Sequence, residues 1–114
     1  MRMRALIVED EILTALHLET ELAELDIETV GIAVDTGQAM ALVAMGPDVA
    51  FVDVNLRDGP TGPAIAQALA QSNVLIFFIT ANPAQLPEAD AARFRVIPKP
   101  FCLDDLRDAL LTVH

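Results

Sequence analysis

Short apolar runs of strand length alternate with helical patterns along the whole chain. This alternation favours right-handed crossovers and one parallel sheet covered by helices on both faces. The predicted fold class is therefore α/β, doubly wound around a five-stranded parallel sheet. We predict strands over residues 6–8, 27–34, 49–54, 74–79 and 94–97, and helices over residues 11–25, 37–45, 61–71 and 103–113.

Two of these elements carry further expectations. The run 74–79 is almost entirely apolar, as in a strand buried on both faces, and we expect it to be the central strand. Thr61 is expected to cap the helix over residues 61–71. Pro83 and Pro87 interrupt the stretch that would form a fourth helix. Proline removes a backbone donor and clashes inside a helix, so we expect this helix to be short or irregular.

Length and composition narrow the possibilities. A chain of 114 residues buries about two-thirds of its surface without disulfides, and we expect one domain over residues 1–114. Cys102 is the only cysteine, and no apolar run reaches the ~18 residues of a membrane span. We therefore expect a cytoplasmic protein without membrane insertion.

The charge of the chain is strongly acidic. Lys and Arg number 7 against 17 Asp and Glu, a formal net charge of −10, and no Lys or Arg occurs from residue 5 to residue 56. Such a surface repels phosphate backbones, so nucleic acid is not expected as a direct partner. The acidic excess could also serve only to keep the protein soluble.

Polar side chains stand at the ends of four predicted strands. Glu9 and Asp10 follow the first, Asp53 lies in the third, and Thr80 and Lys99 follow the fourth and fifth. In open α/β sheets ligands bind at the carboxyl ends of the strands, so these side chains should converge. Two carboxylates about 4 Å apart repel by roughly 4 kcal/mol at an effective dielectric near 20. A lysine and a hard divalent ion held by oxygen, Mg²⁺ above all, would offset that repulsion.

This combination indicates phosphoryl transfer onto a carboxylate. A metal beside a carboxylate, with a lysine and a hydroxyl to meet the phosphoryl oxygens, positions the group and neutralises its charge. Asp53 is the expected acceptor, because it interrupts an apolar run where an isolated charge would be costly. Taken singly, Asp10 could be a helix cap, Glu9 could favour a helix dipole, and Thr80 and Lys99 could be ordinary residues.

With these residues identified, the chain resembles the receiver domain of two-component response regulators over essentially its whole length. The matching segments are residues 6–11, 49–56, 79–81 and 99–101. The resemblance implies a flavodoxin-like sheet of order 2-1-3-4-5. It also implies a signalling phosphoacceptor rather than an enzyme, with a sensor histidine kinase or a histidine phosphotransfer protein as its partner.

The resemblance also implies residue roles. Asp53 would accept the phosphoryl group from a phosphohistidine, and Lys99 and Thr80 would contact the phosphoryl oxygens. The Lys99–Pro100 bond is expected to be cis, and Ala81 to be the small residue that leaves the site open. Mg²⁺ would be held by Glu9, Asp10, Asp53 and the backbone carbonyl of Asn55.

The chain departs from the family pattern in its switch. Val96 stands three residues before the lysine, where an aromatic residue is usual, and the nearest aromatic residue is Phe94. We therefore expect smaller conformational shifts on phosphorylation, centred on the segment after Thr80 and around Val96. No effector domain follows His114 in this sequence, so output is expected from the domain itself or from a removed remainder. A receiver-like scaffold that works without phosphorylation is the alternative.

Two further hypotheses concern partners and chemistry. Leu13 and Leu16 lie roughly opposite the apolar stripe of their predicted helix, and they either dock the helix bundle of a kinase or phosphotransfer protein or are stray surface leucines. A phosphatase of the haloacid dehalogenase class also uses a strand-end Asp, a Thr, a Lys and Mg²⁺. That class needs a second Asp two residues after the nucleophile, where this chain has Asn55.

Overall fold

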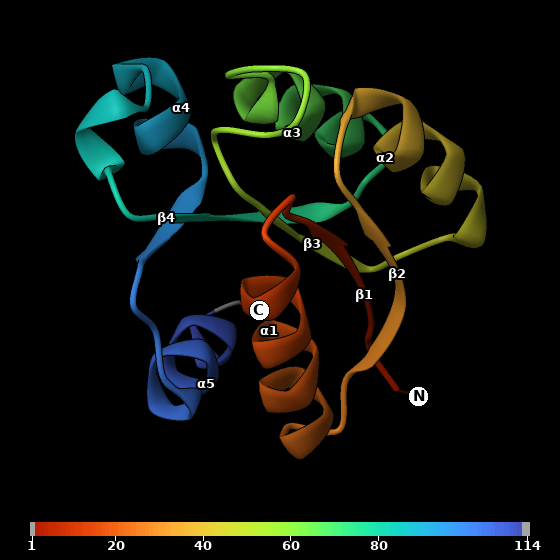
Figure 1. Cartoon of the computed structure of the whole chain (residues 1–114). Coiled ribbons are helices and arrows are strands. Elements are labelled where there is room, and N and C mark those ends of the chain that lie inside the picture. The colour runs from red at the N-terminus through yellow and green to blue at the C-terminus, as the bar shows by residue number, and fades with distance from the viewer. Residues whose placement is uncertain (1, 113–114) are drawn as a thin grey trace.

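The computed structural model describes residues 2–112 and contains one five-stranded parallel sheet (Figure 1). The sheet order is β2-β1-β3-β4-β5, as the resemblance implied. The strands are β1 (Arg4–Val8), β2 (Glu28–Ala33), β3 (Val49–Val52), β4 (Leu75–Thr80) and β5 (Arg95–Pro98). The helices are α1 (Ile12–Glu24), α2 (Thr36–Leu42), α3 (Gly62–Gln71), α4 (Glu88–Arg93) and α5 (Leu103–Leu111), with short 3₁₀ turns η1 (Val43–Met45) and η2 (Pro83–Gln85).

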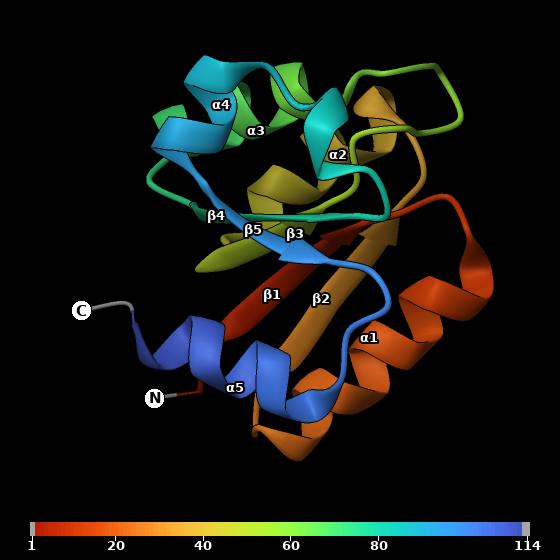
Figure 2. The same ribbon diagram turned by 90° about the vertical axis from the view of Figure 1, so that its left-hand side faces the viewer.

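Helices cover both faces of the sheet. Figures 1 and 2 show α1 and α5 on one face and α2, α3 and α4 on the other. Successive side chains of a strand point to opposite faces, so each interior strand contributes side chains to the hydrophobic cores on both faces of the sheet. In β4, Phe77 packs with the α1 and α5 side, where it stacks on Phe51 at a ring-centroid distance of 5.4 Å, and Phe78 packs with the other side. The doubly wound class is confirmed.

Residues 74–79 were predicted to form the central strand of the sheet, buried on both faces. The burial is confirmed, but the position in the sheet is wrong. Ile76, Phe77, Phe78 and Ile79 are all buried, as expected of a strand covered on both faces. The middle strand of the sheet is β3, however, and β4 lies between β3 and β5. Burial on both faces marks any interior strand of a parallel sheet, so it does not single out the middle one.

Two local expectations are also corrected. β3 ends at Val52, so Asp53 lies just beyond the strand, and the Val54 amide donates to Asp53 Oδ1 at 2.7 Å instead of to a neighbouring strand. Thr61 occupies the residue before α3, but its hydroxyl donates to Asp58 Oδ1 at 2.6 Å and does not cap the helix.

The fourth helix is short, as the prolines predicted. It spans 6 residues and is preceded by the η2 turn that begins at Pro83. Gln67 of α3 donates to the buried Asp90 carboxylate at 2.9 Å, which ties this short helix to its neighbour. The last helix ends at Leu111, whereas we predicted it to residue 113, which lies outside the described residues.

Candidate functional site

The polar residues predicted to converge do stand at the carboxyl edge of the sheet. Glu9 follows β1, Asp53 follows β3, Thr80 ends β4 and Lys99 follows β5. Because all strands are parallel, these four positions come to the same edge. Within the described chain, Glu9 and Thr80 are two of the three buried polar or charged residues. Buried polar side chains thus gather at this edge, although they do not contribute to the hydrophobic core.

The Lys99 ammonium lies between two carboxylates. Its Nζ atom donates to Asp53 Oδ2 at 2.9 Å and to Glu9 Oε1 and Oε2 at 3.2 and 3.1 Å. The three side chains are 19% (Lys99), 12% (Asp53) and 5% (Glu9) exposed, so water screens these ion pairs only weakly. One cation thus bridges residues that are far apart in the sequence.

Asp10 completes a group of three carboxylates. One oxygen each of Glu9, Asp10 and Asp53 lies within 4.8 Å of the others. Glu9 is buried, Asp53 is half-buried and Asp10 is exposed, so the group opens to solvent on the Asp10 side. Three carboxyl groups face one ammonium, so the cluster carries excess negative charge whenever all three are ionised. Carboxylate oxygens gathered in this way suit a hard divalent cation such as Mg²⁺.

The charges shift the titration of the buried groups. The pKa of Glu9 is raised from 4.5 to about 8, first by burial and then by the hydrogen bond and charge of Asp53, while Lys99 acts in the opposite direction. Burial acts to lower the pKa of Lys99, but Asp53 and then Glu9 outweigh it, so that pKa is raised above its ordinary value. The ammonium therefore stays charged at neutral pH, while Glu9 is poised to exchange a proton when the charge beside it changes.

Backbone contacts fix the position of Asp53. Its amide donates to Val8 O at 2.9 Å, which continues the β1–β3 ladder by one residue. On the other side, the Gly62 amide donates to Val54 O at 3.1 Å, so the first turn of α3 packs against the chain beside Asp53. The carboxylate is held between a strand end and a helix start.

Thr80 and Asn55 lie at the site with other partners. The Thr80 hydroxyl accepts a hydrogen bond from the Asn82 amide at 3.1 Å, and Thr80 is 2% exposed. The side chain of Asn55 is exposed and bonds to Gln85 in both directions at 2.8 Å. Lys99 donates its amide to Thr80 O at 2.9 Å, and the Lys99–Pro100 peptide is cis, as the resemblance implied.

Sequence reasoning missed two residues here. Gln85 was part of an unassigned stretch, and its bond to Asn55 spans 30 positions, so no local pattern could reveal it. Gly62 lies inside the helix predicted over residues 61–71, and no local pattern shows that its backbone comes close to Asp53 and Val54. The side chain of His17 is about half exposed and stacks on Phe101 at a centroid distance of 4.9 Å.

A hollow of about 300 Å³ adjoins the cluster. Glu11, Thr14 and His17 of the α1 region line one side, and Ala81, Lys99, Pro100 and Phe101 line the other. On α1 nearby, Ile12, Leu13 and Leu16 are 58, 75 and 45% exposed. An apolar surface thus lies next to the polar edge.

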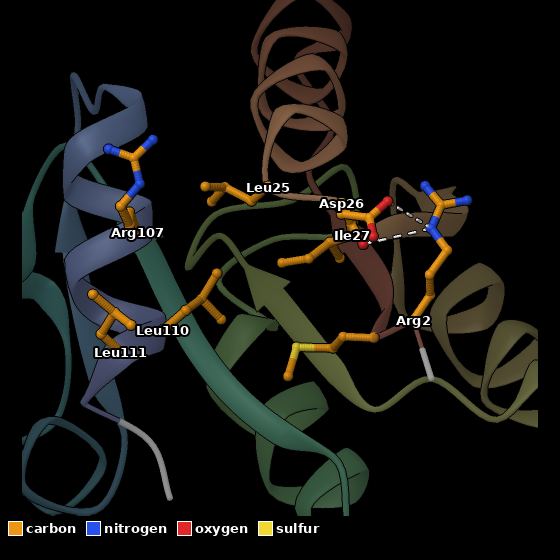
Figure 3. A pocket seen from close by; sticks show the side chains of 8 residues that line it. Arg2, Leu25, Asp26, Ile27, Arg107, Leu110 and Leu111 are labelled. Atoms are coloured by element: carbon orange, nitrogen blue, oxygen red, sulfur yellow. Dashed lines mark hydrogen bonds and ion pairs between the residues drawn. The ribbon is translucent and has the colours of Figure 1, made fainter.

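A second hollow, of about 380 Å³, is distant from these residues (Figure 3). It lies where β1 and β2 begin, against α5, and its floor includes Leu25, Ile27 and Leu110. Two arginines line it, but Arg2 pairs with Asp26 at 3.2 Å and Arg107 pairs with Asp104 at 2.8 Å. None of the predicted site residues reaches this hollow.

The family model of the response regulator receiver domain matches residues 5–111. The chain belongs to the response regulator receiver domain family. Signalling domains of this family are generally not enzymes and generally bind Mg²⁺, and the acidic cluster of this receiver can hold a metal ion. No match was found among curated proteins. No helix within residues 2–112 is long and apolar enough to cross a membrane.

Solved structures of receivers resemble this one closely. SdrG from Sphingomonas melonis Fr1 is 36% identical, with a TM-score of 0.81 over 96% of this chain and 94% of SdrG. The receiver domain of PhyR from Erythrobacter litoralis is 28% identical, with a TM-score of 0.85 over 97% of this chain and 88% of that one. A CheY-like receiver from Methylobacillus flagellatus shares the fold at 22% identity, with a TM-score of 0.88 and full coverage of both chains.

The receiver has no aromatic side chain at residue 96. Val96 is half-buried and packs against the core on the α2, α3 and α4 side of the sheet. Phe94, two residues earlier, meets Phe78 edge-on at a centroid distance of 5.7 Å. Phe94 is thus already packed against β4.

Proposed function

We propose that this receiver accepts a phosphoryl group on Asp53 from a phosphohistidine, in a reaction that requires Mg²⁺. The observation that carries the proposal is the Lys99 ammonium held 2.9 Å from Asp53 Oδ2 and 3.1 Å from Glu9 Oε2. An ammonium in that place neutralises charge beside the attacking carboxylate, where phosphoryl transfer needs it. Thr80, at the end of the next strand, supports the same proposal.

The transfer balances without further reactants. An Asp53 oxygen forms the new P–O bond as the P–N bond to the donor histidine breaks, and the electron pair of that bond returns to the imidazole nitrogen. Glu9, Asp10, Asp53 and the backbone carbonyl of Asn55 would hold Mg²⁺, which supplies positive charge to the phosphoryl oxygens when bound. Lys99 and the Thr80 hydroxyl take the remaining phosphoryl oxygens.

The donor is proposed to be a sensor histidine kinase or a histidine phosphotransfer protein. Leu13 and Leu16 on α1 offer it an exposed apolar surface beside the hollow that ends at Lys99. A helix bundle that covers these leucines brings its histidine to the open side of the carboxylate cluster. The polar edge supplies the chemistry and the leucines supply the docking area.

The downstream role is proposed to be a phosphorylation-dependent change of a protein-binding surface, in a single receiver domain over residues 1–114 in the cytoplasm. Phosphorylation adds about −1.5 to −2 charges at Asp53, which attracts Lys99 and Thr80 and biases the segments attached to them. Because Val96 replaces the usual aromatic residue, we expect the shifts to centre on the segment after Thr80 and around Val96.

Val96 also favours a second candidate, a receiver-like scaffold that works without phosphorylation. One experiment separates the two. Binding of beryllofluoride, with and without Mg²⁺, is measured for the wild type and for Asp53→Ala. The proposed function requires Mg²⁺-dependent binding in the wild type and none in the variant. Absence of binding in a folded wild-type protein favours the scaffold.

A further inference from the structure

The side chains of Asn55 and Gln85 form a closed pair of amide hydrogen bonds. Asn55 Nδ2 donates to Gln85 Oε1, and Gln85 Nε2 donates to Asn55 Oδ1, both at 2.8 Å. Both residues are exposed, so neither needs the other to satisfy a buried group. The pair joins the loop after Asp53 to the segment after Thr80. It therefore links the chain that follows β3 to the chain that follows β4.

The two ends of the pair differ in how firmly they are held. The loop that carries Asn55 is anchored by Asp53 to Val8 O, by Gly62 to Val54 O, and by the two bonds between Leu56 and Gly59. The segment 81–87 contains one 3₁₀ turn, in which the Gln85 and Leu86 amides donate to Asn82 O and Pro83 O. Leu86 is its one buried residue, and the others are exposed. The amide pair therefore fastens a segment with few anchors to a firmly held one.

Thr80 connects this segment to the site. Its hydroxyl accepts the Asn82 amide at 3.1 Å. A phosphoryl group on Asp53 would draw the Thr80 hydroxyl toward it, which frees the Asn82 amide and pulls on the residues that follow. The amide pair opposes that movement, because Gln85 lies three residues beyond Asn82 and is fixed to Asn55.

We propose that Gln85 is a positioning residue that holds segment 81–87 in its unphosphorylated arrangement through Asn55, so that the amide pair must open when Asp53 is phosphorylated. The inference rests on the proposed function of Asp53. Removing an interaction made only in the resting state shifts the equilibrium toward the activated state and tightens the binding of any ligand that selects it. Loss of Gln85 should therefore improve activation, whereas ordinary structural damage would weaken it.

The test is titration of the full chain with beryllofluoride in the presence of Mg²⁺. For Gln85→Leu we expect the half-saturating concentration to fall about fivefold, the ratio that corresponds to about 1 kcal/mol for a net hydrogen-bond contribution. Hydrogen exchange of the amides at positions 85 and 86 should also become faster in the protein without beryllofluoride. Gln71→Leu, the same change at an exposed position at the end of α3, is the matched control and should leave both measurements at wild-type values.

Each outcome has a distinct meaning. Tighter beryllofluoride binding with faster exchange in Gln85→Leu alone supports the proposal. Unchanged or weaker binding in Gln85→Leu, with normal binding in the wild type, overturns it and leaves the proposed function intact. If the wild-type protein binds no beryllofluoride, the proposed function is wrong. The positioning role of Gln85 is then wrong as well, because it depends on phosphorylation of Asp53.

Discussion

A Cβ atom at Gly62 would lie 2.1 Å from the backbone carbonyl oxygen of Asp53 and 2.8 Å from Val54 Cα. Both neighbours are backbone atoms, so no side chain can rotate away to make room. Only glycine allows the first turn of α3 to approach the loop that positions the Asp53 carboxylate.

Gly62→Ala should therefore displace that loop. Overpacking of this kind costs about 1–3 kcal/mol, which should lower the melting temperature and reduce Mg²⁺-dependent phosphorylation by acetyl phosphate. Gly37→Ala is the control, because its Cβ would meet only Asp35 Oδ1, at 3.7 Å, and alanine favours the helix. Equal melting temperatures for Gly62→Ala and wild type would contradict the steric argument.

Replacing Lys99 by methionine should uncouple metal binding from phosphorylation. Without the ammonium, the largely buried Asp53 carboxylate loses its cationic partner, so the metal-free variant should melt at a lower temperature than wild type. Mg²⁺ should raise the melting temperature of Lys99→Met by more than that of wild type, while phosphorylation by acetyl phosphate falls at least about tenfold. Thermal denaturation with and without Mg²⁺ measures the first effect. A variant as stable as wild type without metal would show that the ammonium is not needed to offset the carboxylates.

The raised pKa of Glu9 predicts a pH dependence of stability. The folded state holds a proton on Glu9 up to a pKa of about 8, whereas the unfolded chain loses it near the ordinary value of 4.5. The folded state thus binds more protons in this interval, and stability must fall as pH rises from the lower value through the higher one. Metal-free protein should melt at a lower temperature at ~pH 9 than at ~pH 5, and Glu9→Gln should reduce that difference.

Mg²⁺ affinity should depend on the same ionisation of Glu9, but it should increase with pH whereas the stability of the metal-free protein decreases. The ion competes with the Glu9 proton, so its binding should strengthen as pH rises toward about 8 and level off above that value. Calorimetry in buffers of different ionisation enthalpy would detect the released proton. Proton release that is the same in Glu9→Gln would assign it to another group.

The exposed leucines of α1 predict a difference between protein and small-molecule donors. Replacing Leu13 and Leu16 together by serine should slow phosphotransfer from a kinase or phosphotransfer protein at least about tenfold, because a buried docking contact is lost. Labelling by acetyl phosphate, which needs no docking surface, should stay unchanged. Leu111→Ser, which alters a 65% exposed leucine on α5, is the control. Equal loss with both donors would show that the leucines serve the fold or the site and not docking.

Periodicity was enough to predict the fold class because the apolar pattern is strong where the sheet is covered. The run that became β4 lacks polar residues until Thr80, and the resemblance supplied the strand order. The end of β3 was predicted two residues too late. There the Val54 amide donates to the carboxylate of the adjacent Asp53, and the Val54 carbonyl accepts from the Gly62 amide at the start of α3, a tertiary contact without a local signal.

The site shows the same division. Glu9, Asp53 and Lys99 could be placed together because each stands at the end of a parallel strand, a position that the alternating pattern specifies. The partner of the Asn55 side chain could not be predicted, because Gln85 belongs to a proline-rich connection whose path depends on packing against the rest of the molecule. Strand ends are readable from periodicity, whereas contacts between loops are not.

The edges of the sheet limit how copies of this domain can associate. β5 is an outer strand of four residues, with the exposed charge of Arg95 at one end and Pro98, which lacks an amide donor, at the other. On the opposite edge, β2 begins with the exposed Glu28, and its register with β1 shifts between Ala5 and Leu6. Short, charged or irregular edge strands resist pairing with a further strand. Crowding many copies of the domain together should therefore not extend the sheet from one molecule to the next, and any contact between copies is left to the helices.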